Sequence, residues 1–420
     1  MLRTFCAVLF AAACLTVPPP AVGQQPTQRQ VDSLAAQVRQ LRARLDSLLA
    51  GLGRQPAAPA AAPAPVGDDL AALRAAARQA AGAGARDSAQ AADTIGTQFV
   101  GRERNQSQLN PEIGVTGDVR GYATGRGVQR DNFDPREFEI GFQSALDPYS
   151  HTKIFVSLEN GEIGLEEGYA YWTGLPGRLR LDLGKFRQQF GELNRWHLHA
   201  VPETEYPLAL TTFLGEDGLA GTGISVYRAF GGFGTHELSA QVTRSASDSE
   251  LFGDAGRPTY LAHLLNFWQL GRSTYMQIGA TALYGTAPDS ALRTKVGGAE
   301  FRFTWRPPAR ALYHEWTVRG ELLAVQKEVA GTGPTRLGGY VSSTYKLNQR
   351  FILGARYDYV ESPDFGVITR QVVPSLTMWQ SEWVFLRAQY QWRRIANTPA
   401  DHQLAFQAVW AIGPHKHETY

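Results

Sequence analysis

The feature that most constrains the fold of this chain is a long series of segments, starting near residue 111, in which apolar and polar side chains alternate. Residues 299–306 read Ala-Glu-Phe-Arg-Phe-Thr-Trp-Arg, and residues 136–143 and 384–393 follow the same two-residue period. Such a period places the apolar side chains on one face of a β-strand and the polar side chains on the other. Each segment is about ten residues long, which is the length of a tilted strand that crosses a membrane.

Sixteen segments of this kind follow one another along the chain. We predict strands at 112–122, 136–146, 151–159, 165–174, 178–186, 219–229, 236–245, 259–270, 274–285, 295–306, 311–326, 335–346, 350–361, 369–379, 383–394 and 402–412. Short connections such as 147–150 alternate with mostly longer ones, a pattern typical of the periplasmic turns and external loops of outer-membrane barrels. The sequence therefore predicts an all-β fold, a closed antiparallel transmembrane barrel of about 16 strands within residues 96–420, with both chain ends in the periplasm.

The composition agrees with this fold class and argues against others. The chain has 43 Gly, 16 Tyr and 9 Trp but only 3 Met, as expected for aromatic-rich β structure with many turns. No apolar run approaches the roughly 20 residues that a transmembrane helix needs. The formal net charge of +2 gives no indication of nucleic-acid binding.

Residues 1–23 have the pattern of a secretory signal peptide. The apolar stretch 5–17 is followed by prolines, and residues 21–23 supply the small side chains of a cleavage site. Both cysteines, Cys6 and Cys14, lie in this segment, so the mature chain would have no disulfide. An alternative is a lipoprotein signal in which Cys14 is acylated. Both interpretations predict export, and we expect the protein in the cell outer membrane.

Three segments of different composition precede the predicted barrel. Residues 24–55 carry Val and Leu at the spacing of a coiled coil, although a single amphipathic helix packed on another element would show the same pattern. Residues 56–68 are rich in Pro and Ala and predict an extended linker. Residues 69–95 predict an Ala-rich helix. We expect these segments in the periplasm, where the coiled coil would reach towards the cell wall.

The longest connection, residues 187–218, is too apolar for an external loop surrounded by water, because it contains Phe190, Trp196 and Phe213. If the loop folds into the barrel, these side chains pack on the wall and the loop narrows the pore. We predict that it forms the pore constriction. Its candidate polar residues are Arg187, Asn194, Arg195, His197, His199, Glu203 and Glu205.

The polar faces of the strands supply the candidate pore-lining residues. These are Arg120, Arg180, Arg302, Arg306, Arg319, Arg356, Arg387 and Arg393. Rings of arginine favour anions through fixed charge and bidentate contacts. Acidic residues such as Asp118, Glu139 and Asp358 are interleaved with them. Two interpretations therefore stay open: a weak preference for anions, or a salt-bridged wall with general permeability.

Four motifs carry a resemblance to a known family. They are Asn110-Pro-Glu-Ile, Glu139-Ile-Gly-Phe-Gln-Ser-Ala-Leu-Asp-Pro-Tyr, Glu166-Glu-Gly-Tyr and Leu183-Gly-Lys-Phe-Arg-Gln-Gln-Phe-Gly-Glu-Leu-Asn. Over residues 110–230 the chain resembles the phosphate-selective porin O and P family, and over the remainder it does so only in pattern. The resemblance implies a porin that assembles as a homotrimer, in some members behind a periplasmic coiled coil. Phosphate selectivity is not carried over, because its members rely on a surplus of lumenal Arg and Lys and this chain has only six lysines.

Motifs of catalytic or metal sites are scarce in the chain. It contains no Gly-x-Ser-x-Gly, no His-Glu-x-x-His and no Gly-rich phosphate loop before a Lys. His197 and His199 share one face of an extended segment and would bind Zn²⁺ together with Glu203 or Glu205. The interpretation that we favour is that they order the loop through hydrogen bonds. We therefore predict no catalytic residue, no metal and no cofactor.

The function favoured by the sequence is that of a porin, a water-filled channel for passive diffusion of small hydrophilic solutes. The alternative is a structural tether that links the barrel to the cell wall through the coiled coil, which would explain the N-terminus but not a polar lumen. An outer-membrane hydrolase would need a nucleophile and a base, and no motif supplies them. The expected partners are solutes, some of them anionic, outer-membrane lipid and two further copies of the chain.

Overall fold

The computed structural model describes residues 111–126, 131–159, 161–246, 251–253, 257–287, 292–328 and 333–413. The chain divides into two compact units, Met1–Arg102 and Glu103–Tyr420, and every described residue belongs to the second unit. The predicted signal peptide, coiled coil, linker and Ala-rich helix lie outside the described residues.

The second unit is built from sixteen strands. Their bounds are β1 Glu112–Thr124, β2 Asp131–Ala145, β3 Ser150–Glu159, β4 Glu162–Leu175, β5 Leu179–Arg187, β6 Ala220–Gly232, β7 Gly234–Ala246, β8 Thr259–Gln269, β9 Thr274–Thr286, β10 Arg293–Trp305, β11 Glu315–Lys327, β12 Thr335–Lys346, β13 Phe351–Glu361, β14 Ile368–Trp379, β15 Val384–Ile395 and β16 Asp401–Ile412. The largest differences from prediction are at the start of β2, which begins at Asp131 rather than at residue 136, and at the start of β11. A short 3-10 helix over Pro308–Arg310 occupies the turn before β11 and delays its start to Glu315.

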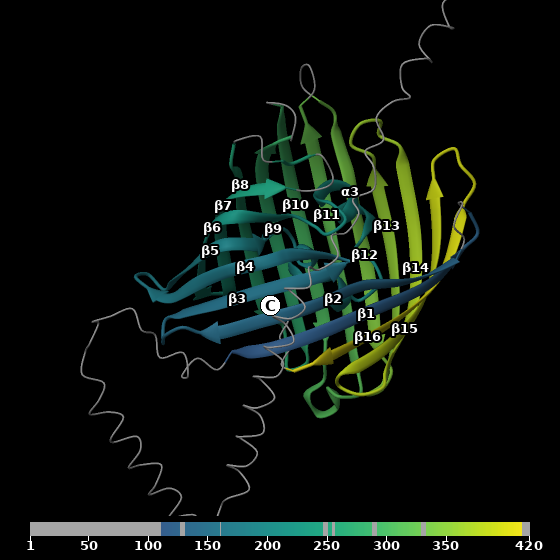
Figure 1. The fold of residues 1–420 in the computed structure, drawn as a ribbon, viewed down its shortest axis with the longest axis horizontal. Helices are drawn as coiled ribbons and strands as arrows, with labels where there is room; N and C mark the ends of the chain where they lie inside the picture. The colour runs from purple at the N-terminus through teal and green to yellow at the C-terminus, as the bar shows by residue number, and fades with distance from the viewer. Residues whose placement is uncertain are drawn as a thin grey trace, which may run out of the picture. The chain divides into compact units, whose positions relative to one another are not determined.

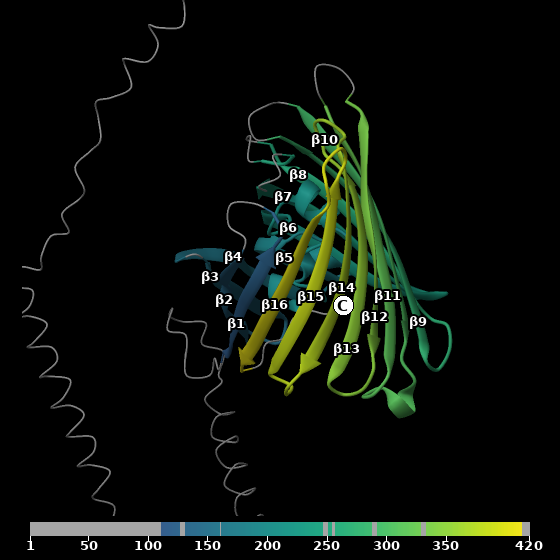
Figure 2. The same cartoon turned by 90° about the vertical axis from the view of Figure 1, so that its right-hand side faces the viewer.

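Each strand pairs with its neighbours in sequence, and β1 pairs with β16 to close the sheet into a barrel. All of these pairings are antiparallel; in the closing pair, Val119 lies opposite Ala408. Figures 1 and 2 show the strands running around the barrel in chain order from β1 in blue to β16 in yellow. Closure leaves no strand edge unpaired, which matters in lipid because each unsatisfied backbone group there costs several kcal/mol. The predicted closed antiparallel barrel is confirmed.

The barrel wall is apolar on its outer face and polar on its inner face, which is the reverse of the arrangement in a soluble protein. On β12, Leu337 and Val341 are exposed, whereas Tyr340 and Ser342 are buried. Exposed large apolar side chains occur on all sixteen strands, whereas most buried polar side chains project inward from the same strands. A sheet that is apolar outside and polar inside is the pattern of a barrel in lipid.

The connection between β5 and β6, residues 188–219, folds back into the barrel, and we call it the inner loop. It contains two 3-10 helices, Leu193–Arg195 and Leu198–Ala200, and the helix α3, Leu208–Leu214. The helix contacts β12 and β13 across the lumen from β5. Among the described residues, no helix is both long enough and apolar enough to cross a membrane.

An apolar core lies between the inner loop and one side of the barrel wall. Phe190, Leu210 and Phe213 of the inner loop are almost completely buried. They belong to one cluster with Leu323 of β11 and Val360 of β13. Full burial of each large apolar side chain contributes about 1.5–3 kcal/mol. This cluster therefore holds the inner loop against the wall.

Candidate functional site

The two ends of the inner loop are tied together by Asn194. Its side-chain amide Nδ2 donates to the carbonyls of Gln188, at 2.7 Å, and Leu219, at 3.0 Å. Its Oδ1 accepts from the Leu219 N–H at 2.7 Å. Asn194 is itself buried, so these bonds are shielded from water. Its position at the base of the loop fixes where the loop leaves and rejoins the wall.

Glu321 of β11 anchors the first turn of the inner loop. Its Oε1 accepts from the N–H groups of Glu192, at 3.2 Å, and Leu193, at 3.1 Å, and from the Tyr340 hydroxyl at 2.9 Å. Gly191 has a φ of +59°, and a Cβ there would overlap the Glu321 carboxylate. Glycine is therefore required at this position both by conformation and by space.

A second anchor lies near the β1–β16 closure, where Glu203 and Glu205 meet arginines of the wall. Arg356 Nη1 of β13 is 2.9 Å from Glu203 Oε2, and Arg120 Nη1 of β1 is 2.7 Å from Glu205 Oε1. Arg387 of β15 donates to the Glu203 carbonyl at 2.7 Å. These contacts join the inner loop to strands on both sides of the β1–β16 closure.

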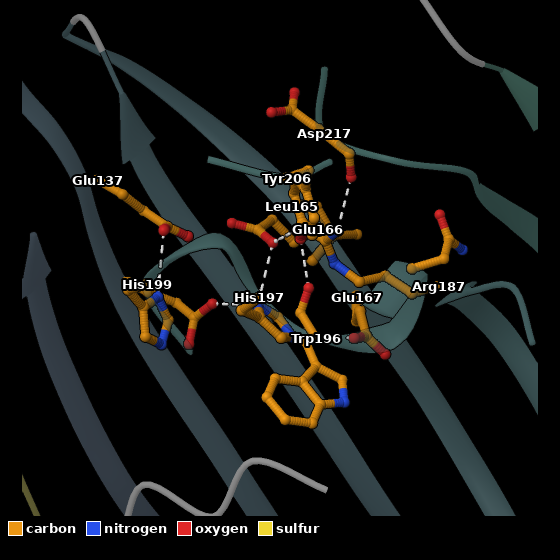
Figure 3. A network of polar contacts seen from close by, with 12 residues as sticks. Glu137, Leu165, Glu166, Glu167, Arg187, Trp196, His197, His199, Tyr206 and Asp217 are labelled. Atoms are coloured by element: carbon orange, nitrogen blue, oxygen red, sulfur yellow. Dashed lines mark hydrogen bonds and ion pairs between the residues drawn. The ribbon is translucent and has the colours of Figure 1, made fainter. Parts of the chain in front are cut away.

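The third anchor is a group of six side chains that we call the histidine–glutamate cluster: Glu137 and Glu139 of β2, Glu166 and Glu167 of β4, and His197 and His199 of the inner loop (Figure 3). His197 Nδ1 contacts Glu139 Oε2 and lies 3.1 Å from Glu166 Oε2, and its Nε2 lies 3.0 Å from Glu167 Oε1. His199 Nδ1 lies 3.1 Å from Glu137 Oε2. The cluster is almost entirely shielded from water.

Charge within this cluster changes the proton affinity of both imidazoles. Burial by itself lowers the pKa of His197, but the carboxylates of Glu139 and Glu166 outweigh it and raise that pKa well above its usual value. Burial also lowers the pKa of His199, but the hydrogen bond to Glu137 and the charges of Glu137 and Glu139 together outweigh it, so the pKa is raised. Both rings therefore hold a proton more readily than an exposed histidine does.

Arg187, the last residue of β5, connects this cluster to the inner loop. Its Nη2 donates to Glu166 Oε2 at 2.8 Å, and its Nη1 donates to the Tyr206 hydroxyl at 3.0 Å and to the Asp217 carbonyl at 2.6 Å. Burial raises the pKa of Tyr206 to about 12, so its hydroxyl keeps its proton and donates to the Trp196 carbonyl.

The structure places the seven predicted constriction residues at different depths. Arg187, Asn194, His197, His199 and Glu203 are buried, and Arg195 and Glu205 are half-buried. The histidines meet glutamates of β2 and β4 rather than Glu203 or Glu205, which pair with Arg356 of β13 and Arg120 of β1.

Most of the eight predicted pore-lining arginines lie next to acidic side chains. The ion pairs are Arg120 with Asp134 and Glu205, Arg180 with Asp182, Arg302 and Arg319 with Glu192, Arg306 with Glu315, Arg356 with Glu203 and Asp358, and Arg393 with Glu205. Arg387 donates instead to Gln407, Thr377 and the Glu203 carbonyl. The wall is therefore rich in paired charge.

Cavities lie on both sides of the inner loop. On the side of the longer connections, two cavities of about 580 and 450 Å³ share Glu159, Leu198 and Asp217 in their linings. On the side of the short turns, a cavity of about 540 Å³ is lined by Trp196 and by residues near the β10–β11 turn. Trp196 and Leu198 thus separate spaces that open towards opposite ends of the barrel.

The sequence did not single out Glu137, Glu166 or Glu167 as site residues. A bulge explains why the last two both belong to the cluster: in the β3–β4 pairing, Val156 lies opposite Leu165 and Phe155 lies opposite Glu167, which leaves Glu166 as the extra residue. Strict alternation would point two consecutive residues to opposite faces. The signal available for Glu137 was its place on the polar face of β2.

No protein-family model matches the chain. An uncharacterized protein of Aquifex aeolicus (strain VF5) is 31% identical over 131 residues, which cover 30% of this chain and 28% of that protein. The chain thus spans little more than a quarter of the length of the curated relative that it matches.

Solved structures with the same fold include three outer-membrane proteins. The anion-selective porin from Comamonas acidovorans matches with a TM-score of 0.52, 10% identity and coverage of 73% of this chain and 100% of that chain. The outer membrane channel DcaP of Acinetobacter baumannii matches with a TM-score of 0.50, 13% identity and coverage of 75% and 100%. OprB of Pseudomonas putida matches with a TM-score of 0.52, 7% identity and coverage of 72% and 94%. At these identities the likeness shows a shared fold and nothing further.

Proposed function

We propose that this protein is an outer-membrane porin, a water-filled channel for passive diffusion of small hydrophilic solutes. The observation that carries the proposal is the polar interior of a closed barrel, with cavities on both sides of an inner loop that is anchored to the wall. A barrel of about 16 strands is wide enough for an aqueous channel unless it is obstructed. The structures with the same fold include one titled a porin and one titled a channel.

The inner loop is the part of the molecule that would set the narrowest point of this channel. Its anchors lie on β2, β4, β11 and β13, so the loop crosses the lumen rather than following one wall. The predicted constriction residues would act in two ways: the buried ones hold the loop in place, and the half-buried Arg195 and Glu205 face the solute path.

We infer that selectivity for ions is weak, with at most a modest preference for anions. Fixed charge selects ions most strongly when it is unpaired, and the wall arginines lie mostly next to acids. Three bases, Arg302, Arg306 and Arg319, line the cavity on the short-turn side. They meet two acids, because Glu315 pairs with Arg306 and Glu192 pairs with both Arg302 and Arg319, which leaves one positive charge in excess. This excess supports a slight enrichment of anions at that mouth. Membership of the phosphate-selective porin family rests on the sequence resemblance and is part of the same proposal.

Single-channel recording in planar bilayers tests the porin function. Purified protein should produce discrete conductance steps, and a KCl gradient should give a small reversal potential whose sign indicates a slight preference for chloride. A protein that inserts into the bilayer without conducting would contradict the porin function and leave the structural tether. A strong preference for cations would contradict the proposed selectivity alone.

We also propose that three copies of the chain assemble in the membrane, as the family resemblance implies. Native mass measurement in mild detergent should then give the mass of a trimer. Removing residues 24–95 should leave a folded barrel, since the strands begin at Glu112. Finding only monomer for the full chain would overturn the trimer. A smaller assembly after the removal would assign trimer formation to the predicted coiled coil.

A further inference from the structure

We propose that the histidine–glutamate cluster binds a divalent transition-metal ion of the Zn²⁺ class, held by His197 Nδ1 and by carboxylate oxygens of Glu137, Glu139 and Glu166. Such an ion would fasten the inner loop to β2 and β4. The inference goes beyond the proposed channel function, and its test does not depend on conductance.

The first argument is geometric. One ligand atom from each of these four residues lies within 4.8 Å of all the others. Within that set, His197 Nδ1 is 3.1 Å from Glu166 Oε2. Ligands bound about 2 Å from a shared zinc ion are no more than about 4 Å apart, so small rotations of glutamate side chains complete the site. The ligands come from three separate elements, so the ion would link parts of the chain that pack together only in the folded barrel.

The second argument is the hydrogen bonding around the ligands. His197 Nε2 lies 3.0 Å from Glu167 Oε1, so the Nε2–H donates to that carboxylate and the Nδ1 lone pair points to the other glutamates. Metal-binding histidines usually donate their second ring N–H to a carboxylate in this way. Arg187 holds Glu166 Oε2 at 2.8 Å, which fixes a further ligand. The surroundings thus orient the ligands as a metal site requires.

The third argument is charge. The other two anchors of the inner loop with buried carboxylates differ in composition. The Glu203 carboxylate pairs with the Arg356 guanidinium, and the Glu321 carboxylate accepts from backbone N–H groups and a hydroxyl. Here four carboxylates gather around two imidazoles, with the guanidinium of Arg187 at the edge. Buried charges are stable only when they are paired or bound to metal. A single divalent cation would balance the negative charge of two of these carboxylates.

The ligand types indicate the class of ion, and a neighbouring cavity gives the ion a route to the site. Imidazole combined with carboxylates suits Zn²⁺ and neighbouring transition metals, whereas Mg²⁺ and Ca²⁺ prefer all-oxygen ligands. Glu137 and Glu166 also line the cavity of about 580 Å³ beside the inner loop. An ion therefore has a path to the site from the lumen without unfolding of the barrel.

Isothermal titration of Zn²⁺ into the untagged, chelator-treated full chain in detergent tests the proposal. We expect one high-affinity ion per chain and no comparable binding of Mg²⁺ or Ca²⁺. The His197→Gln variant should lose this binding. Glu167→Gln, which removes the partner of His197 Nε2 but no ligand, should weaken it by about 10- to 100-fold. His402→Gln is the matched control, since His402 is exposed on the outward face of β16, and it should bind as the unaltered chain does.

Two further measurements keep the outcome decisive. Co²⁺ bound in the site should give visible d–d absorption that is lost in His197→Gln, and barrel folding of each variant is checked by heat-modifiable migration on gels. If His197→Gln does not fold, Glu167→Gln and Glu139→Gln carry the test. Absence of Zn²⁺ binding, or Zn²⁺ binding that all three variants retain, would overturn the site. In the first case the cluster is a network of imidazoliums and carboxylates; in the second, Zn²⁺ binds elsewhere on the chain.

Discussion

At the scale of single residues, the interior of this barrel depends on charged side chains that are buried together. Arg356 is the clearest case, because its side chain is fully buried and lies between Glu203, at 2.9 Å, and Asp358, at 3.0 Å. Both carboxylates are buried as well. A buried pair of this kind adds little net stability, but removing one partner leaves uncompensated charge behind.

The Arg356→Met substitution should therefore destabilise the folded barrel. Loss of one partner from a buried ion pair costs about 3–5 kcal/mol, and the two orphaned carboxylates here place the effect at the upper end. Urea unfolding in lipid vesicles measures the free energy of unfolding. Arg306→Met serves as control, because the Arg306 side chain is 53% exposed and its pair with Glu315 should contribute at most about 1 kcal/mol. Equal stability of the two variants would contradict this account.

At the scale of elements, the inner loop behaves as a separate layer inside the barrel. An apolar cluster holds its α3 side against β11 and β13, whereas polar anchors hold its remaining parts. The combination matters because an apolar contact tolerates sliding, while hydrogen bonds to Glu321 and Arg356 specify one position. The loop is thereby kept at a fixed place in the lumen.

Removing residues 194–206 should widen the channel. This change eliminates Trp196 and Leu198, which separate the cavities, and Glu203 and Glu205, which hold the loop across the lumen. We expect larger single-channel conductance and weaker discrimination between ions. Heat-modifiable migration on gels should stay unchanged, because the strands pair with one another and not with the loop. Unaltered conductance would place the constriction elsewhere.

At the scale of the whole molecule, the wall separates two environments. Side chains such as Leu376 and Phe406 are exposed on the outward face, whereas Gln371 and Gln407 of the same strands, β14 and β16, are buried inside. A barrel with an apolar outer band is soluble only in a membrane or a detergent micelle. This arrangement supports the proposed location in the outer membrane.

The Val372→Arg substitution tests this orientation. Val372 faces outward near the middle of β14, so an arginine there should enter the centre of the bilayer and cost about 2–4 kcal/mol. Phe365→Arg is the control, since Phe365 is 85% exposed in the connection between β13 and β14 and should tolerate the charge. Unfolding in lipid vesicles gives both free energies. A barrel that accepts arginine equally at both positions does not have lipid around β14.

The strands and the polarity of their faces were accessible to prediction from sequence, because each follows from local chemistry. The pleat sends successive side chains to opposite faces, so alternation alone separated the outward Phe301 and Trp305 from the inward Arg302. The alternation of short and longer connections then indicated an antiparallel barrel. The inward fold of the inner loop was predicted in the same way, from an apolar content that needs a wall to pack on.

The pairings inside the lumen could be read only from the tertiary structure. Glu203 meets Arg356, 153 residues along the chain, because closure of the barrel places β13 beside the middle of the inner loop. His197 meets both Glu166 and Glu167 of β4 because a bulge at Glu166 allows these consecutive residues to reach the same cluster. A period of two residues assigns a side chain to a face, but it carries no information on which side chain will lie across the lumen. That choice depends on strand register and loop position, which arise when segments distant in sequence pack together.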